Sequence, residues 1–325
     1  MLVRILKNIG ISVVSVLAVA VVLVFSQRPG QTTGEGGLDF RRQLTAGREN
    51  PAALQALPMR DGYQMQVRTY GGADNVPLLV LVHGSGWHGL QFDRLANELS
   101  GDADVIVPDL RGHGTAPGRR GDIDYIGQLE DDLADLIKAV AKPGQKVIMG
   151  GHSSGGGLVV RFAGGQHGDL LDGAILLAPF LKYNAPTTRE NSGGWAHVLT
   201  RRIIGLSILN SVGMTTFNHL PVIQFNMPRT VLEGPLGDTA TTSYSFRLNT
   251  SFAPRSRYLD DVAALPPFVL LAGSADEAFD ASQYAPTMGD VTSKGRYDMI
   301  LGANHLDLVD DPRTEAIIKG FVNEF

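Results

Sequence analysis

The stretch Val147-Ile148-Met149-Gly150-Gly151-His152-Ser153-Ser154-Gly155-Gly156-Gly157 places a serine between two glycines, each two residues away. An apolar run precedes Ser153, and residues 158–162, which can turn helical, follow it. This order predicts a strand, a sharp turn with Ser153 at its apex, and a helix. So tight a turn strains the serine backbone and leaves room only for glycine at 151 and 155. Ser153 is therefore the candidate nucleophile, and Ser154 is a poorer one because His152 stands two residues before it. The alternative is a glycine-rich loop with incidental serines.

Composition limits the class of protein. The chain has 325 residues, of which 43% are hydrophobic and 19% charged, as in a folded globular protein of one large domain or two modest ones. A net charge of −5 argues against nucleic-acid binding. The absence of cysteine excludes disulfides and thiolate metal sites, and it leaves the cellular compartment open.

The N-terminal segment, residues 1–27, contains an almost wholly apolar run, Ile9–Phe25. As a helix this run would extend about 26 Å, close to the hydrocarbon thickness of a bilayer. Arg4 and Lys7 precede it, which favours an N-terminus in the cytoplasm. We expect an uncleaved, single-pass transmembrane anchor, because the run is longer than the apolar region of a usual signal peptide. The alternative is a secreted protein cleaved after Val24-Phe25-Ser26. Both interpretations place the body of the protein outside the cytoplasm.

Residues 28–50 are expected to form a flexible linker, and residues 51–325 the folded body. A hairpin turning at Asp61-Gly62 opens the body. Apolar runs then alternate with helical stretches, with strands expected at 78–82, 104–107, 147–149, 174–177, 267–272 and 297–301. One of the helices is expected over Asp122–Val140. This pattern predicts an α/β fold with a mostly parallel sheet, covered by helices on both faces. Functional loops are expected at the carboxyl ends of the strands.

The alternation stops between about residues 181 and 260, which predicts a mainly helical cap inserted over the strand ends. This segment has eight Lys and Arg residues against four Asp and Glu residues. Within it, residues 203–228 carry no charge. They are interpreted either as a mobile apolar lid or as a surface that packs the cap onto the body.

An acid and a base are expected beyond the serine, because a serine hydroxyl needs a histidine to activate it and a carboxylate to orient that histidine. Asp276 stands four residues beyond an expected strand, and His305 is the only histidine after it. Asp280 is the reserve candidate, and Glu277 is less favoured. The alternative for Asp276 is a turn-forming aspartate.

Two backbone N–H groups are expected to stabilise the developing oxyanion. One belongs to Ser154, directly after the nucleophile. The other belongs to Ser85, in the loop His83-Gly84-Ser85-Gly86-Trp87 after an expected strand. The alternative for this loop is a plain tight turn.

The remaining histidines suggest no metal site. His83, His113 and His152 are expected to form hydrogen bonds within strand-end loops, and His88 could line the pocket. His83 and His88 lack both the spacing of a helical zinc pair and a nearby acidic partner.

Five motifs together resemble the α/β-hydrolase superfamily: His83-Gly84-Ser85-Gly86, Asp109-Leu110-Arg111-Gly112-His113-Gly114, Gly151-His152-Ser153-Ser154-Gly155, Gly273-Ser274-Ala275-Asp276 and Gly302-Ala303-Asn304-His305. The chain is most similar to the monoacylglycerol lipase and lysophospholipase-like serine hydrolases. The resemblance runs from about Leu57 to the C-terminus, except in the cap. It implies a triad of Ser153, Asp276 and His305, an oxyanion hole at Ser85 and Ser154, and no cofactor.

The leading hypothesis is a membrane-anchored serine hydrolase that cleaves acyl or lipid-like carboxylic esters through an acyl-enzyme. Its expected partners are a small acyl ester and, through the N-terminal helix, the membrane. One alternative is a peptidase similar to proline iminopeptidases, but these use carboxylates to hold the substrate's amino group, and the cap has few. Another is a non-catalytic binding protein on the same fold. We expect the cap to decide what Ser153 attacks.

Overall fold

The computed structural model describes residues 2–34, 37–45, 51–72 and 75–325. Its centre is an eight-stranded sheet in the order β1-β2-β4-β3-β5-β6-β10-β11. β1 pairs with β2, and β2 with β4, in antiparallel fashion, while the other neighbours are parallel. The strands are β1 (Gln55–Pro58), β2 (Gln64–Tyr70), β3 (Leu78–Val82), β4 (Asp104–Asp109), β5 (Val147–His152), β6 (Gly173–Leu177), β10 (Phe268–Gly273) and β11 (Gly295–Ile300). The expected mostly parallel sheet is confirmed.

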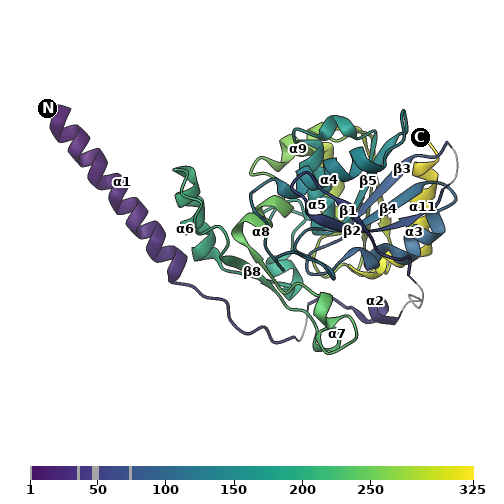
Figure 1. Ribbon diagram of the computed structural model, residues 1–325, viewed down its shortest axis with the longest axis horizontal. Helices are drawn as coiled ribbons and strands as arrows, with labels where there is room; N and C mark the ends of the chain where they lie inside the picture. Colours follow the sequence, from purple (N-terminus) through teal and green to yellow (C-terminus); the bar gives the residue numbers. More distant parts are fainter. Residues whose placement is uncertain (1, 35–36, 46–50, 73–74) are drawn as a thin grey trace.

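Helices cover both faces of this sheet (Figure 1). α3 (Asp93–Leu99) and α11 (Pro312–Val322) contact each other on one face, and α5 (Ser154–Ala163) contacts α9 (Tyr258–Ala264) on the other. The remaining helices of the body are α4 (Gln128–Val140) and α10 (Tyr284–Gly289). Every residue of β3, β5, β6 and β10 is buried, which is why these strands appear in the sequence as continuous apolar runs.

α4 begins later than the sequence pattern predicted. We expected the helix from Asp122, but it starts at Gln128. Asp122 instead pairs with Arg119 and Arg247, and Gly127 has a left-handed φ of 103°. A left-handed residue cannot continue an α-helix, so it separates this ion-paired loop from α4.

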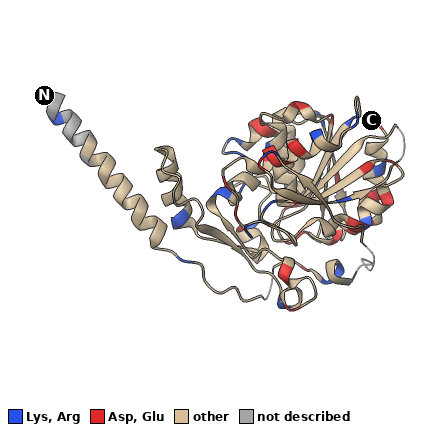
Figure 2. Cartoon of the chain, viewed as in Figure 1, with Lys and Arg blue, Asp and Glu red and all other residues tan. Residues whose placement is uncertain are grey.

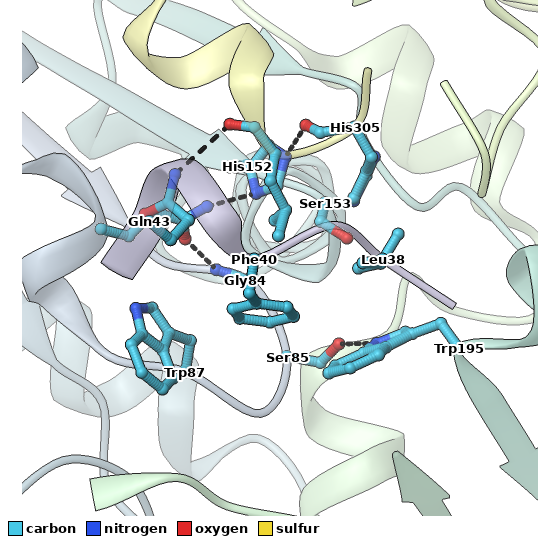
Figure 3. A pocket seen from close by; sticks show the side chains of 12 residues that line it. Leu38, Phe40, Gln43, Gly84, Ser85, Trp87, His152, Ser153, Trp195 and His305 are labelled. Atoms are coloured by element: carbon cyan, nitrogen blue, oxygen red, sulfur yellow. Dashed lines mark hydrogen bonds between the residues drawn. The ribbon is translucent and has the colours of Figure 1, made fainter. Parts of the chain in front are cut away.

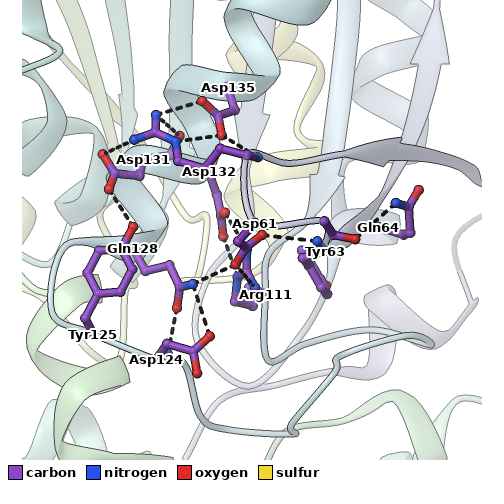
Figure 4. A network of polar contacts seen from close by, with 12 residues as sticks. Asp61, Tyr63, Gln64, Arg111, Asp124, Tyr125, Gln128, Asp131, Asp132 and Asp135 are labelled. Carbon is purple, nitrogen blue, oxygen red and sulfur yellow. Dashed lines mark hydrogen bonds and ion pairs between the residues drawn. The ribbon is translucent and has the colours of Figure 1, made fainter.

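Arg111 joins β4 to α4 and to the hairpin turn (Figure 4). Its Nε and Nη2 donate to Asp132 on α4 at 2.8 and 2.7 Å. Its Nη1 lies 2.9 Å from Asp61 Oδ2, and its guanidinium lies 4.1 Å from the centre of the Tyr63 ring. The arginine of the Asp109–Gly114 motif therefore has a structural role, and it holds the loop that carries His113.

The cap contains a sheet as well as helices. Its helices are α6 (Thr200–Ser211), α7 (Arg229–Leu232) and α8 (Phe246–Phe252). An antiparallel sheet of β7 (Ala196–Val198), β8 (Pro221–Phe225) and β9 (Ser243–Ser245) lies beside them. The expectation of a mainly helical cap missed this sheet, because strands of three to five residues are too short to show an alternating pattern.

The N-terminal apolar run forms α1 (Leu2–Phe25), which packs against cap helix α6. Ala20 and Val24 are fully buried there. Gly205 permits the close approach, since a Cβ at this position would lie 2.5 Å from the carbonyl oxygen of Ala20. Within the described part of the chain, no helix combines the length and apolarity that a membrane span needs. The expected transmembrane anchor is therefore not supported; the helix that the structure shows is packed on the cap along one stripe.

The uncharged stretch of residues 203–228 packs in two places. Phe225 and Met227 belong to the main hydrophobic core that the body forms, so part of the stretch does pack the cap onto the body. Leu206 and Leu209 of α6 join Ala20, Val24 and Phe246 in a small apolar cluster, separate from the main core. Most charged side chains lie on the body rather than on this part of the cap (Figure 2).

The segment expected as a flexible linker makes defined contacts with the cap. The N–H of Gly30 donates to Gln224 Oε1 at 2.9 Å, and Gln224 Nε2 donates back to the Gly30 carbonyl at 2.8 Å. The N–H of Gly34 donates to Asn226 Oδ1 at 2.8 Å. Amide side chains of the cap thus replace water as hydrogen-bond partners of this backbone. The short helix α2 (Arg41–Thr45) comes next in the chain.

Candidate active site

Ser153 lies at the turn between β5 and α5. Its φ of 56° and ψ of −122° are unfavourable for a residue with a side chain. A Cβ at Gly151 would lie 2.4 Å from the carbonyl carbon of Gly155, and one at Gly155 would lie 2.2 Å from the oxygen of Val82. The predicted strand, sharp turn and helix are confirmed, together with the steric reason for the two glycines.

Asp276 follows β10, His305 follows β11, and both are buried. His305 Nδ1 donates to Asp276 Oδ2 at 2.8 Å, and Asp276 Oδ1 accepts the N–H groups of Ala278 and Phe279 at 2.8 Å each. Burial opposes the charge on Asp276, but His305 and the two backbone donors together leave the pKa of Asp276 below its ordinary value. An ionised Asp276 keeps the ring proton on Nδ1, so Nε2 is free to accept a proton.

The structure brings Ser153 and His305 to the same cavity (Figure 3). No hydrogen bond joins the Ser153 hydroxyl to the imidazole among the described residues; such contacts often tighten only when substrate binds. In the part of the chain that the structure describes, the two alternatives to Asp276 as the acid, Asp280 and Glu277, form no hydrogen bond with the His305 ring. Asp280 accepts the N–H of Ser282, and Glu277 Oε2 accepts the N–H of His305 at 2.9 Å. Glu277 thus supports the backbone of His305 rather than its ring.

The side chain of His83 orients the N–H of Ser85 in the His83–Trp87 loop. His83 Nε2 accepts the N–H of Leu110 at 3.1 Å, so its proton is on Nδ1, which donates to the Gly84 carbonyl at 2.8 Å. Because C=O and N–H point in opposite directions across a trans peptide, this bond aims the Ser85 N–H away from His83. Burial lowers the pKa of His83 to about 4, which keeps the ring neutral.

Ser85 follows β3 and Ser154 opens α5, and the N–H groups of both remain the predicted oxyanion donors. Ser154 is the first residue of α5, so its N–H has no acceptor within the helix. Within the described residues, the Ser85 N–H also has no hydrogen-bond acceptor. Both residues line the cavity that Ser153 faces.

A buried chain of hydrogen bonds connects this loop to His305 through His152. Gln91 Oε1 accepts the N–H of Gly84 at 3.1 Å, and Gln91 Nε2 donates to His152 Nδ1 at 2.7 Å. His152 Nε2 then donates to the carbonyl of His305 at 2.9 Å. Burial, and next the neighbouring His305, lower the pKa of His152 to about 3, so His152 is neutral. Gln91 was not identified from the sequence, where nothing distinguishes it from other helix-forming residues.

The cap also holds the loop, through three residues that the sequence analysis missed. The N–H of Gly86 donates to the Tyr244 hydroxyl at 2.7 Å, and the Gly86 carbonyl accepts the N–H of Thr241 at 2.9 Å. Trp195 Nε1 donates to Ser85 Oγ at 3.2 Å. The cap therefore contributes directly to the conformation of the expected oxyanion loop.

Tyr244 also contacts His113. The Tyr244 hydroxyl lies 2.6 Å from His113 Nε2, and His113 Nδ1 donates to the Arg111 carbonyl at 3.1 Å. Since a carbonyl can only accept, Nε2 must accept from Tyr244. Burial and then His83 lower the pKa of His113 well below its ordinary value, consistent with a neutral ring. The expectation for His88 was wrong, because it contacts Thr239 at 2.8 Å and lines neither of the two cavities at Ser153.

Two cavities meet at Ser153. The larger, about 840 Å³, lies under the cap and is mainly apolar. Its apolar lining includes Phe180, Ile203, Ile223, Phe225, Phe252 and Phe279. The charged side chains that line it in the described structure are Arg161, Lys182, Arg189, Arg255 and Glu190. The smaller cavity, about 10 Å³, also borders Ser153 and lies against residues Leu38, Phe40 and Gln43.

Comparison with known proteins agrees with this architecture. Human monoglyceride lipase is 26% identical over 238 residues, which cover 70% of this chain and 75% of that protein. A soluble variant of monoglyceride lipase from Saccharomyces cerevisiae superposes with a TM-score of 0.63 at 19% identity, over 85% of this chain and 96% of its own. A putative aryl esterase from Burkholderia cenocepacia has a TM-score of 0.60 at 17% identity, over 84% and 98% of the two chains. The family model described as serine aminopeptidase, S33, matches residues 73–311. Since that match spans most of the chain, the protein belongs to this family of α/β-hydrolases.

Proposed function

We propose that this hydrolase cleaves carboxylic esters that carry a long apolar, lipid-like group. The observation that carries the proposal is the position of Ser153 and His305 in the lining of an apolar cavity of about 840 Å³. Pockets for small-molecule ligands measure roughly 300–1,000 Å³ and are predominantly apolar. The similarity to human monoglyceride lipase supports the same substrate class.

The proposed reaction uses an acyl-enzyme. Ser153 Oγ attacks the ester carbonyl carbon while His305 Nε2 accepts its proton, and Asp276 stabilises the resulting imidazolium. The N–H groups of Ser85 and Ser154 donate to the oxyanion. His305 then donates its proton to the departing alkoxide. A water molecule, deprotonated by His305, attacks the acyl carbon and releases the acid and Ser153. These steps require no cofactor.

A peptidase reaction is the second candidate, because the matching family model is described as serine aminopeptidase. An aminopeptidase site needs anionic groups to hold the substrate's amino terminus. The described lining of the large cavity has one carboxylate, Glu190, against four cationic side chains. This charge favours an ester without an amino group. A comparison of aminoacyl arylamides with acyl esters of equal size tests the choice, and faster arylamide cleavage would favour the peptidase.

Active-site labelling tests the nucleophile. We expect a fluorophosphonate probe to label the protein and Ser153→Ala to abolish both labelling and ester hydrolysis. Ser282→Ala, which changes a serine beside Asp280, is the matched control and should keep both. Labelling that persists in Ser153→Ala would place the nucleophile elsewhere.

We also propose that the hydrolase body lies outside the cytoplasm. Arg4 and Lys7 ahead of the apolar residues 9–25 support this location, because cations followed by an apolar run are also the pattern of an export signal. An alkaline phosphatase fused after Phe325, which is active only when exported, should be active in a bacterial host. An inactive fusion of normal abundance would contradict the proposal.

A further inference from the structure

A strap of chain, residues 37–45, crosses the active site in front of Ser153 (Figure 3). Leu38 and Phe40 point inward and are only 6% and 4% exposed. The Phe40 ring packs edge-on against Trp87 and at a tilt against Trp195, with both pairs of ring centres 5.6 Å apart. Two large aromatic contacts give this segment a defined position over the site.

The strap is attached on both sides of the active site. Gln43 Nε2 donates to the carbonyl of Leu306, the residue after His305, at 3.4 Å. Ahead of the strap, the N–H of Gly34 donates to Asn226 of the cap at 2.8 Å. The strap therefore bridges the loop that carries His305 and the cap that encloses the large cavity.

The two cavities at Ser153 differ greatly in size, and the strap bounds the smaller one. Ser85, Ser153, Trp195 and His305 line both cavities. The cavity under the cap measures about 840 Å³, whereas the one bounded by Leu38 and Phe40 measures about 10 Å³. A volume of roughly 10–15 Å³ is what a single water molecule needs.

This asymmetry bears on the substrate, because the two halves of an ester extend in different directions from the carbonyl carbon that Ser153 attacks. One half has space for a long chain, and the other has space for a very small group. We propose that Leu38 and Phe40 of the strap determine specificity by restricting one half of the ester to about one or two carbon atoms. This inference rests on the proposed ester hydrolysis, and it narrows the substrate class to esters with one long apolar half and one short half.

Two series of esters measure the restriction on each half, using the full chain. In one, octanoate is esterified with methanol, butanol or octanol. In the other, octanol is esterified with acetic, butyric or octanoic acid. For the wild-type protein we expect kcat/KM to fall at least about tenfold between the shortest and the next member of one series, since misfitting methylene groups cost about 10-fold or more in discrimination.

Variants of the strap show whether it causes the restriction. Phe40→Ala and Leu38→Ala should remove most of this fall in kcat/KM. Leu38→Val is a smaller truncation that disturbs the fold less, and it should remove part of the fall in kcat/KM. Leu44→Ala is the matched control, because Leu44 is on the same strap but exposed and outside both cavities. It should retain the wild-type profile.

The outcomes separate this inference from the proposed function. Equal rates for short and long groups in both series of wild-type measurements would overturn the inference. So would a fall that persists unchanged in folded Phe40→Ala, Leu38→Ala and Leu38→Val proteins. If the wild-type protein neither hydrolyses any ester of either series nor reacts with a fluorophosphonate, the proposed function itself fails.

Discussion

The hydroxyl of Tyr244 connects the cap to the loop that carries one expected oxyanion donor, and Tyr244→Phe tests this connection. The substitution keeps the buried ring and removes one oxygen atom. That oxygen accepts the N–H of Gly86 at 2.7 Å and contacts His113 Nε2 at 2.6 Å. Without it, the N–H of Gly86 and the Nε2 of His113 each lose a buried partner, since Tyr244 is only 1% exposed.

The structure limits both the expected loss of stability and the expected fall in kcat. A buried N–H without an acceptor costs about 1–3 kcal/mol of stability, and the unpaired nitrogen of His113 adds to this cost. Complete removal of an oxyanion-hole donor lowers kcat by roughly 10²–10³-fold. Here the donor of Ser85 is displaced rather than removed, and the bonds from Thr241 and Trp195 remain. We therefore expect kcat to fall about tenfold, below that limit.

The assay compares steady-state hydrolysis of a 4-nitrophenyl ester with urea unfolding of the same protein. A positioning role predicts a lower kcat with little change in KM. It also predicts that affinity for a trifluoromethyl ketone, whose adduct resembles the tetrahedral intermediate, falls in parallel with kcat. Tyr63→Phe is the matched control, since Tyr63 also loses one backbone hydrogen bond, to Ala116, but lies at the hairpin turn. A folded Tyr244→Phe protein with kcat and ketone affinity within twofold of wild type would refute this reasoning.

Three further predictions follow from buried ionisable side chains. Asp276→Asn should lower kcat by about 10⁴-fold, because the amide no longer holds His305 in the tautomer that accepts a proton, and ester kinetics on a folded variant with native unfolding behaviour would show it. Arg111→Met should lower the free energy of unfolding by about 3–5 kcal/mol in urea titrations, since it leaves Asp132 buried without its partner; a change below 1 kcal/mol would contradict this. Acid should destabilise the fold through His83, whose pKa falls from 6.5 to about 4 on folding. The unfolded chain binds this proton more readily, so stability falls between about pH 6.5 and 4, by up to about 3 kcal/mol, and His83→Gln should show a smaller fall.

The body of the fold could be predicted from the sequence because its signals are local. β3 coincides with the predicted strand 78–82, since a strand buried on both faces is a continuous apolar run. The hairpin turn at Asp61-Gly62 was also predicted correctly, and Gly62 has the expected positive φ of 84°. The cap sheet was missed because its strands are short and pair through residues far apart in the chain.

For the candidate site, the sequence indicated Ser153, Asp276 and His305 through residue type and order. The structure places Ser153 and His305 at one cavity, and Asp276 is hydrogen-bonded to His305. Order along the chain carries this information because each residue follows its own strand, and parallel strands end at the same edge of the sheet. Their catalytic roles are the subject of the experiments above.

By itself, therefore, the sequence determined the parallel sheet, the strained turn at Ser153 and the loops that carry the acid and the base. Only the tertiary structure decided what surrounds them. Tyr244 holds Gly86 across 158 positions of the chain. Leu38 and Phe40 reach the site from the segment that the sequence alone presented as a flexible linker. Such contacts arise from packing between segments far apart in sequence. A local sequence pattern does not predict which distant surface a short polar or glycine-rich segment packs against.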